Sequence, residues 1–316
     1  MNRLFNVLRD YQKEDVLLMV KAKKYINNWD MGLGKTLATL ACVQELDAFP
    51  CIIVCPKFAL TVWQVEIEKW LGMKTTIYSG TPKQREDQWR QFVVRGDKFL
   101  ITNYAMVPEI ALRSGIDVKE IRTAISSRGK WKWGSVIADE IHLGGLLNHK
   151  TSTYKVMLKM SKVIPVGYYL TGTIVRQGCI DLFGPLSLVD NVKFTSYWSY
   201  VNRFCVTTKT PFGKEIERNP ANLIEFRKML RQYMVRRIKE EVLTELPGKL
   251  RQALFVEMNS EQQKVYDELT AELMAIVKET GDLIVTPNQM TLMVRQRQIL
   301  ACPQVLGLKH RSKSVV

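Results

Sequence analysis

The stretch Asp30-Met31-Gly32-Leu33-Gly34-Lys35-Thr36 decides how this chain of 316 residues is interpreted. A glycine-rich turn runs into a lysine and a threonine, and the helix-like run Leu37–Cys42 follows. Glycines allow backbone N–H groups to close around phosphates, and the N-terminus of a helix adds the positive end of a dipole. In such loops the lysine neutralises charge on the β- and γ-phosphates, and the threonine hydroxyl ligates magnesium. The stretch therefore predicts a site for a nucleoside triphosphate.

One position beside this stretch departs from the general phosphate-loop pattern G-x-x-x-x-G-K-[ST]. The pattern places a glycine where this chain has Trp29. We interpret Trp29 as a side chain that packs behind the loop, and the alternative is an ordinary turn with a surface lysine. The nucleotide interpretation assigns the phosphates to Gly32, Gly34, Lys35 and Thr36, and it makes Thr36 a magnesium ligand as well.

Short apolar runs with helix-like stretches between them are typical of buried strands. The runs are Cys51–Cys55, Thr75–Tyr78, Phe99–Thr102, Ser135–Ala138 and Val166–Leu170, and the helix-like stretches include Phe58–Leu71 and Lys83–Arg95. Continuous apolar strands that alternate with helices predict an α/β fold, with a parallel sheet covered by helices on both faces. In such folds ligands bind at the carboxyl ends of the strands.

The second half of the chain has a more helical pattern, so we expect a mostly helical C-terminal extension. The predicted helices are Asp181–Asp190, Ser196–Phe204, Asn222–Arg237 and Ser260 to about Thr280. Ser260 and Gln263 have the spacing of a capping box at the start of the last of these helices. The stretch Thr207–Pro220 predicts a loop, and Gln252–Val256 predicts a strand.

The apolar run that ends at Ala138 leads directly into two acidic residues, Asp139 and Glu140, and then into His142. An acidic residue at a strand end opposite a phosphate loop can hold magnesium, which assigns this role to Asp139. Glu140 can then polarise the water that attacks the γ-phosphate, and His142 can link the site to a neighbouring strand end. The alternatives are acids that cap a helix and a structural histidine. The acids follow the phosphate loop at a suitable separation, which favours the catalytic interpretation.

Two threonines follow the next apolar run. Thr171 and Thr173 lie directly after Leu170, separated by Gly172. Their hydroxyl groups can hydrogen-bond the acids and sense the γ-phosphate, whereas the alternative is an ordinary turn.

The composition points to a polyanionic partner. The chain carries 46 Lys and Arg residues against 31 Asp and Glu residues, a net charge of +15. Nucleic acid is the commonest partner of so basic a protein, although a basic surface that serves only solubility is the alternative. None of the six cysteines forms a C-x-x-C pair, so we expect reduced, mostly buried thiols and no zinc site. No apolar run reaches the length of a membrane span, which predicts a soluble, intracellular protein without a membrane partner.

Taken together, these segments resemble the superfamily-two helicase motors, and specifically the Swi/Snf-type branch of DNA translocases. The resemblance extends from about Leu8 to Leu306. The matching segments are Leu8–Gln12, Asp30–Thr36, Val54–Lys57, Ile101–Tyr104, Asp139–His142, Leu170–Thr173, Leu182–Leu186 and Arg236–Lys239. The resemblance implies two RecA-like lobes with ATP and magnesium between them and double-stranded DNA across the top. Residues 1–240 would form the first lobe with a helical protrusion, and residues 241–316 a linker and the truncated beginning of the second lobe.

The same resemblance implies a role for each matching side chain. Gln12 would read the adenine base, and Lys35, Asp139 and Glu140 would be catalytic. The residues that would face DNA or couple it to the nucleotide are Lys57, Thr102, Asn103, His142, Thr171 and Thr173. The implied activity is ATP hydrolysis coupled to translocation on double-stranded DNA, in a bacterial or viral-host cytoplasm or, in a eukaryote, in the nucleus.

Two departures from the family pattern limit these expectations. The segment Leu143–Leu147 precedes Asn148 and lacks the lysine that the family places there. This difference is either a benign change of the loop or a change that weakens the stimulation of ATP hydrolysis by DNA. The family's second lobe carries further motifs late in the sequence, and no such motif follows Pro303. Arginines of these motifs reach the γ-phosphate and contribute about 10³–10⁵-fold in rate. We therefore expect weak hydrolysis unless a second lobe is supplied by a longer chain or another chain. A non-catalytic DNA-binding module and a small-molecule kinase are the alternatives.

Overall fold

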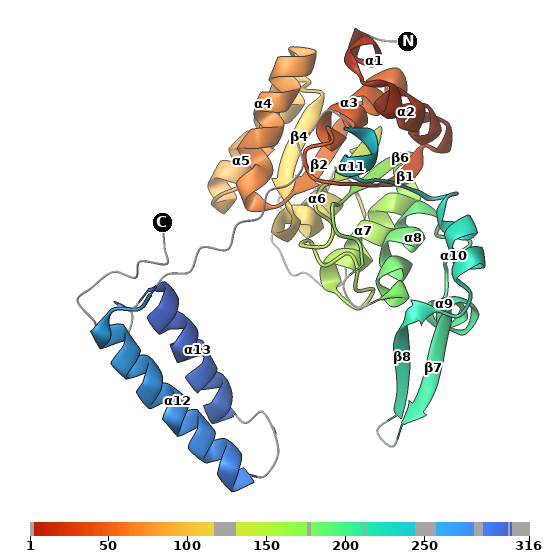
Figure 1. Ribbon diagram of the computed structural model, residues 1–316. Coiled ribbons are helices and arrows are strands. Elements are labelled where there is room, and N and C mark those ends of the chain that lie inside the picture. The colour runs from red at the N-terminus through yellow and green to blue at the C-terminus, as the bar shows by residue number, and fades with distance from the viewer. Residues whose placement is uncertain are drawn as a thin grey trace. The chain divides into compact units, whose positions relative to one another are not determined.

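The computed structural model describes residues 3–116, 131–175, 178–210, 213–243, 257–280, 287–302 and 304. The chain divides into two compact units, residues 1–246 and residues 247–316, which are described separately (Figure 1). None of the helices in these described ranges combines the length and the apolar character that a membrane crossing requires.

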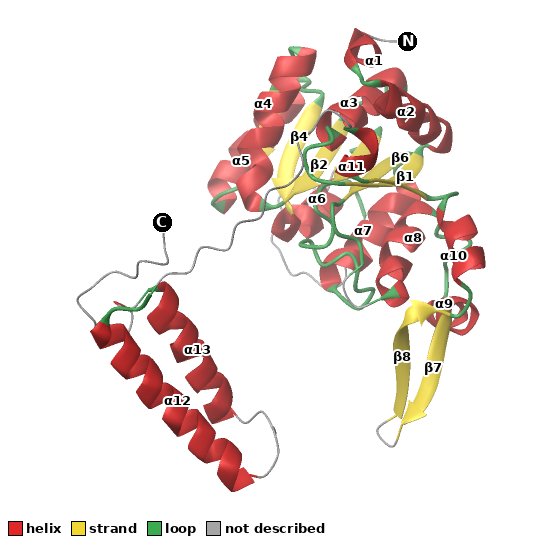
Figure 2. Cartoon of the chain, in the orientation of Figure 1, coloured by secondary structure: helices red, strands yellow, loops and turns green. Residues whose placement is uncertain are grey.

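A parallel sheet of seven strands forms the centre of the first unit, as the sequence predicted (Figure 2). Its order is β3-β4-β2-β5-β6-β1-β9, and every neighbouring pair is parallel. The strands are β1 (Lys24–Trp29), β2 (Cys51–Cys55), β3 (Thr75–Tyr78), β4 (Phe99–Asn103), β5 (Ser135–Ala138), β6 (Val166–Leu170) and β9 (Met234–Arg237). The five apolar runs between Cys51 and Leu170 that were expected to be strands are strands. Because β5, β6 and β1 are neighbours, the polar segments that follow them meet at one edge of the sheet.

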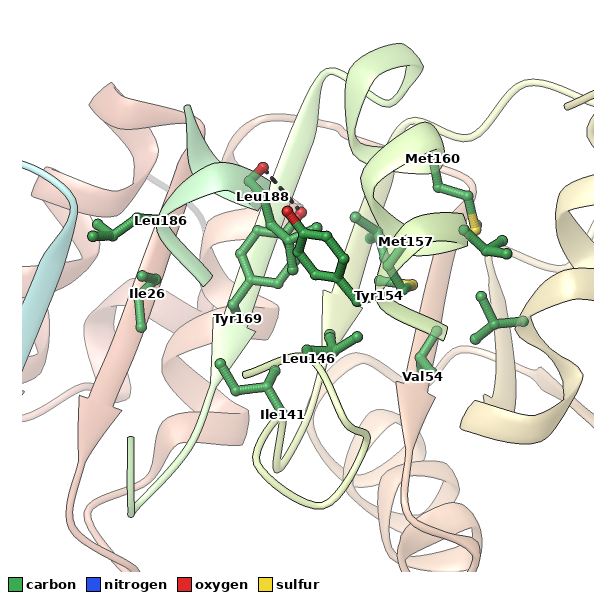
Figure 3. Packing of buried hydrophobic residues seen from close by; sticks show 14 of the residues in the cluster. Ile26, Val54, Ile141, Leu146, Tyr154, Met157, Met160, Tyr169, Leu186 and Leu188 are labelled. Atoms are coloured by element: carbon green, nitrogen blue, oxygen red, sulfur yellow. Dashed lines mark hydrogen bonds between the residues drawn. The ribbon is translucent and has the colours of Figure 1, made fainter. Parts of the chain in front are cut away.

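Helices cover both faces of this sheet, which confirms the predicted fold class. One face carries α1 (Arg3–Val7), α2 (Asp10–Ala22), α3 (Lys35–Glu45) and α4 (Leu60–Leu71); the other carries α5 (Pro82–Arg95), α6 (Val107–Arg113), α7 (Ser152–Val163) and α8 (Phe183–Val189). Side chains alternate along β2, so that Ile52 and Val54 join one buried cluster, and Ile53 joins the other. Figure 3 shows the first of these clusters, which includes Val54, Ile141 and Leu146.

The sequence did not predict strand β1, and it predicted β9 as helix. Strand β1 contains Asn27 and Asn28, which hide its apolar pattern although both side chains are buried. The predicted helix Asn222–Arg237 was wrong at its end, because α10 covers only Leu223–Leu230. Met234–Arg237 pairs instead with β1, whose edge offers backbone hydrogen bonds that a local pattern does not show.

The predicted loop Thr207–Pro220 was also wrong, because an antiparallel hairpin occupies this region. The hairpin consists of β7 (Cys205–Thr210) and β8 (Gly213–Pro220), and it extends away from the sheet (Figure 1). The hairpin follows α9 (Tyr197–Phe204). The threonines that suggested a loop are β-branched residues, which favour strands once a partner strand is present.

Short helical elements complete the first unit. These are the 3-10 turns η1 (Lys57–Ala59), η2 (Tyr104–Met106) and η3 (Cys179–Leu182), and the helix α11 (Lys239–Val242) after β9. The predicted helices Phe58–Leu71, Lys83–Arg95, Asp181–Asp190 and Ser196–Phe204 correspond to α4, α5, η3 with α8, and α9.

The second unit is helical in its described residues, as expected. It contains α12 (Ser260–Thr280) and α13 (Pro287–Ala301). The capping box lies one residue earlier than predicted, because Asn259 Oδ1 accepts the Gln262 N–H at 2.8 Å and the Asn259 N–H donates to Gln262 Oε1 at 3.3 Å. The strand predicted at Gln252–Val256 lies outside the described residues.

Candidate functional site

The glycine-rich turn connects the end of β1 to the start of α3. Gly32 and Gly34 have φ angles of +83° and +80°, a region that glycine enters without steric cost. A Cβ atom on Gly34 would also lie 2.5 Å from the Gln12 amide nitrogen, so a larger residue there would displace the Gln12 side chain. Trp29 is fully buried before the turn, and its indole N–H donates to Asp15 at 3.0 Å. Trp29 therefore packs inside the protein, as expected.

Lys35 is held where it faces the acids. Its ammonium donates to the backbone carbonyls of Trp29 at 2.9 Å and Asp30 at 3.3 Å. Burial lowers the pKa of Lys35 below its usual value, while the charges of Glu140 and Asp139 act in the opposite direction. This partly desolvated cation would interact more strongly with a phosphate than an exposed lysine would.

Asp139 follows β5 and is fixed on several sides. The indole N–H of Trp63 in α4 donates to one carboxylate oxygen at 2.8 Å, and the Glu140 N–H donates to the other at 2.9 Å. The Tyr104 hydroxyl donates to the Asp139 carbonyl at 2.6 Å. Burial raises the pKa of Asp139 above its usual value, although the Trp63 hydrogen bond and Lys35 counteract that shift. A bound cation would relieve the desolvation cost of this half-buried carboxylate.

Glu140 has a strained backbone and an unsatisfied side chain. Its φ angle is +48°, which is rare for any residue other than glycine and tends to occur at functional sites. Its Oε2 atom is buried and accepts no hydrogen bond from any described residue. The His142 Nδ1 atom lies 3.2 Å away, but it makes its hydrogen bond with Thr171. A buried carboxylate oxygen without a hydrogen bond is well suited to binding a water molecule.

His142, Thr171 and Thr173 form a connected network at the ends of β5 and β6. The His142 Nδ1 atom lies 2.8 Å from the Thr171 hydroxyl oxygen. The Thr173 N–H donates to that same oxygen at 3.1 Å, and the Thr171 hydroxyl donates to the Thr173 carbonyl. The network lies between the turn after β6 and the acids after β5, and its coupling role stays a prediction.

Most of the predicted nucleotide residues line one cavity of about 390 Å³. Its lining consists of Met31, Gly32, Gly34, Lys35, Thr36, Leu37, Glu66, Trp70, Asp139 and Glu140. The cavity thus brings the phosphate loop and the two acids together from distant parts of the sequence. Sequence reasoning did not assign Glu66 to the site; its carboxylate accepts the Trp70 indole N–H at 2.8 Å.

Gln12 lies beside the phosphate loop but does not line this cavity. Its amide nitrogen donates to the Leu33 carbonyl at 2.9 Å, and its amide oxygen accepts the Arg9 N–H at 2.8 Å. The Tyr11 hydroxyl donates to the same Leu33 carbonyl at 3.0 Å. The helix that would read the base is therefore attached to the turn that would hold the phosphates. Contact of Gln12 with adenine stays a prediction.

The three residues predicted to face DNA differ in exposure. Lys57 is exposed on η1 after β2. Asn103 is half-buried at the end of β4, where its side chain accepts the Ala105 N–H at 3.0 Å. Thr102 is fully buried and its hydroxyl donates to the Tyr78 carbonyl at 2.9 Å. The side chain of Thr102 therefore lies inside the fold rather than on a surface that DNA can reach.

The loop that departs from the family pattern passes over Tyr104. Ile141 and Leu146 anchor the loop in the core, and a Cβ atom on Gly144 would lie 2.2 Å from the Tyr104 ring (Figure 3 shows Ile141 and Leu146). Only glycine at position 144 leaves room for the ring that holds the Asp139 backbone. No local sequence signal identifies Tyr104 or Trp63 as supports of Asp139, because each contact crosses between elements.

Gly144→Ala is therefore expected to destabilise the protein. The new methyl group overlaps the Tyr104 ring, and overpacking of this kind costs about 1–3 kcal/mol in the free energy of unfolding. Urea unfolding of the single variants and of Tyr104→Ala/Gly144→Ala measures the coupling. In the Tyr104→Ala background the Gly144→Ala change should cost much less, and equal costs in both backgrounds would show that the two residues do not interact.

The sequence and the fold of this chain are both similar to those of known proteins. The family model described as "SNF2-related domain" matches residues 11–305. The chain is 27% identical over 288 residues to the nuclear protein STH1/NPS1 of Saccharomyces cerevisiae, and the match covers 83% of this chain and 19% of that protein. It is 27% identical over 300 residues to the mouse chromodomain-helicase-DNA-binding protein 1-like, where the match covers 90% of this chain and 30% of the relative.

A solved structure with a similar fold is the Sulfolobus solfataricus SWI2/SNF2 ATPase core in complex with double-stranded DNA. The TM-score is 0.58 at 20% sequence identity, and the match covers 96% of this chain and 61% of that one. The chain spans less than a third of the length of the curated relatives named above.

Proposed function

Because the chain belongs to the family of SNF2-related domains, we propose that it is the ATP-binding lobe of a motor that uses ATP to move along double-stranded DNA. The observation that carries the proposal is the cavity of about 390 Å³ that Lys35, Thr36, Asp139 and Glu140 share. A lysine and two half-buried acids that face one cavity suit a triphosphate with its magnesium ion better than they suit an uncharged ligand.

Each residue of the cavity has a distinct part in this proposal. The backbone N–H groups of the turn from Gly32 to Thr36 bind the phosphates, and Lys35 neutralises their charge. Thr36 and Asp139 are oxygen donors of the kind that magnesium prefers, so they would hold the ion directly or through water. When bound, magnesium neutralises charge on the phosphates. Glu140 orients the attacking water and accepts its proton.

The turn after β6 would report the state of the nucleotide. His142 Nδ1 lies 3.2 Å from the Glu140 carboxylate and is hydrogen-bonded to Thr171, whose hydroxyl accepts the Thr173 N–H. A change in the position of the γ-phosphate would therefore reach Thr173 through the Glu140–His142 contact and then through these two hydrogen bonds. Exposed Lys57 and half-buried Asn103, on the same strand-end edge of the sheet, would contact the DNA backbone. Contacts to phosphate rather than to base edges suit a motor that moves over any sequence.

Efficient turnover would require a second RecA-like lobe, from a longer protein or another chain. Arginines from such a lobe stabilise charge on the transferred phosphoryl group. We place the protein in the cytoplasm of a bacterium or of a virus-infected cell, or in the nucleus of a eukaryote, because a DNA motor must reach DNA.

Binding of double-stranded DNA should fall steeply as salt is added, because contacts to phosphate release counterions. Anisotropy of a labelled duplex, measured at several salt concentrations, gives the slope of log K against log salt. Lys57→Ala should reduce that slope by about 1 and weaken all sequences alike, since one phosphate contact is lost. Lys57→Arg is the matched control, and it should preserve the slope. Binding that is insensitive to salt would contradict the DNA assignment.

A further inference from the structure

The chain that follows strand β9 returns to the phosphate loop and is attached to it through Asp30. One Asp30 carboxylate oxygen forms an ion pair with Arg236 at 2.8 Å, and the other accepts the backbone N–H of Lys239 at 3.1 Å. The Asp30 N–H donates to the Arg237 carbonyl at 3.0 Å. These contacts fix the position of Lys239 relative to the loop, although more than 200 residues separate Asp30 and Lys239 in the sequence.

The side chain of Lys239 lies against the glycine turn. A Cβ atom built on Gly32 would be 3.3 Å from the Lys239 ammonium nitrogen and 3.4 Å from the adjacent carbon. The ammonium group is therefore beside the backbone that would hold the phosphates. The residue is half-buried, and within the described ranges its ammonium has no hydrogen bond or ion pair.

None of the described carboxylates forms an ion pair with this ammonium. The Asp30 carboxylate, which holds this segment at the turn, is paired with Arg236 instead. Arg236 also donates to the carbonyls of Asn28 at 3.0 Å and Gly172 at 3.4 Å, so it is held in place from several directions. A half-buried cation beside this turn, without an ion pair among the described residues, is suited to binding an anion.

We propose that Lys239 is a second phosphate-binding lysine, whose ammonium contacts the β- or γ-phosphate of a nucleoside triphosphate at Gly32. This proposal rests on the proposed function, and it adds a ligand contact from outside the motifs that define the loop. A bound triphosphate would then attach α11 more firmly to the nucleotide site.

The test is the affinity of the chain for ATP, ADP and adenosine, measured by calorimetry with magnesium at one fixed salt concentration. Lys239→Ala should weaken ATP binding about tenfold, the effect of one charge-assisted contact at a partly exposed position. Adenosine binding should not change, because adenosine lacks phosphates. Lys239→Arg should restore most of the affinity for ATP. Arg231→Ala removes an exposed positive charge from the same region and serves as the matched control, with no expected change.

A second readout separates a ligand contact from a structural role. Hydrogen exchange of the backbone N–H groups of α11 should slow when ATP binds to the parent protein, and it should not slow in Lys239→Ala. These measurements distinguish a failure of the proposed function from a failure of the proposed role of Lys239. If the parent protein binds no ATP, the proposed function itself is wrong. If the parent binds ATP, Lys35→Ala weakens that binding and Lys239→Ala does not, only the role of Lys239 is overturned.

Discussion

Replacing Lys35 with alanine is expected to weaken ATP binding about 100-fold or more. The ammonium lies in the cavity that also contains Asp139 and Glu140, and it is partly desolvated. A hydrogen bond from a charged donor contributes about 1.5–3 kcal/mol, and each 1.4 kcal/mol changes an affinity tenfold. In the proposed site Lys35 contacts both the β- and the γ-phosphate. Its removal should therefore reduce the binding free energy of ATP by more than the contribution of one such hydrogen bond.

A fluorescent ATP analogue, titrated at constant salt and magnesium, measures this effect. Lys83→Ala is the matched control, because Lys83 is exposed on α5 at the opposite face of the sheet. Its affinity should equal that of the parent. The pH dependence supplies an independent check. Because burial lowers the pKa of Lys35, affinity should begin to fall at a pH below that expected for an exposed lysine. Equal affinities of the parent and Lys35→Ala would place the nucleotide elsewhere.

Replacing Glu140 with glutamine is expected to reduce ATP hydrolysis about 10²–10³-fold, because the neutral amide cannot accept a proton from the attacking water. ATP affinity should change little, since glutamine has the same shape. Hydrolysis is measured as a single turnover with protein in excess over labelled ATP, with and without duplex DNA and in the presence of a second-lobe polypeptide. The outcome also decides between a motor and a non-catalytic module.

Glu66→Gln provides the control for this experiment. Glu66 lines the same cavity, but its carboxylate accepts a hydrogen bond from the Trp70 indole. It is therefore less available to a water molecule than the Glu140 carboxylate is. Its hydrolysis rate should stay close to that of the parent. Equal rates for Glu140→Gln and the parent would contradict the assignment of Glu140. A parent protein that binds ATP and DNA but never hydrolyses ATP would support the non-catalytic module.

The features predicted correctly from the sequence are those whose signal is local. The phosphate loop, the acids after β5 and the apolar strands each occupy a few consecutive residues, so their pattern survives without knowledge of the fold. The edge strand β9 and the buried asparagines of β1 carry no such pattern. Their conformation depends on the pairing of Ile26 with Met234 and of Trp29 with Arg237, which lie far apart in the chain.

The supports of the site were missed for the same reason. Trp63 and Tyr104 hold Asp139 from α4 and η2, and each is an ordinary aromatic residue until the sheet brings these elements together. Lys239 was matched only as the last residue of the segment Arg236–Lys239 and received no role, because its position at Gly32 depends on the contacts that Asp30 makes with the segment after β9. Thr102, by contrast, was predicted to face DNA because it lies in a segment that resembles the family, whereas its side chain points into the fold.

The most direct test of the account is a crystal structure of this chain with a non-hydrolysable ATP analogue and manganese in place of magnesium. Anomalous scattering locates the manganese independently of the protein. We expect the metal between the Thr36 hydroxyl and the Asp139 carboxylate, bound directly or through water, and the triphosphate along the turn from Gly32 to Thr36. Manganese remote from Asp139, or a triphosphate in the separate cavity beside His149 and Tyr197, would contradict the account.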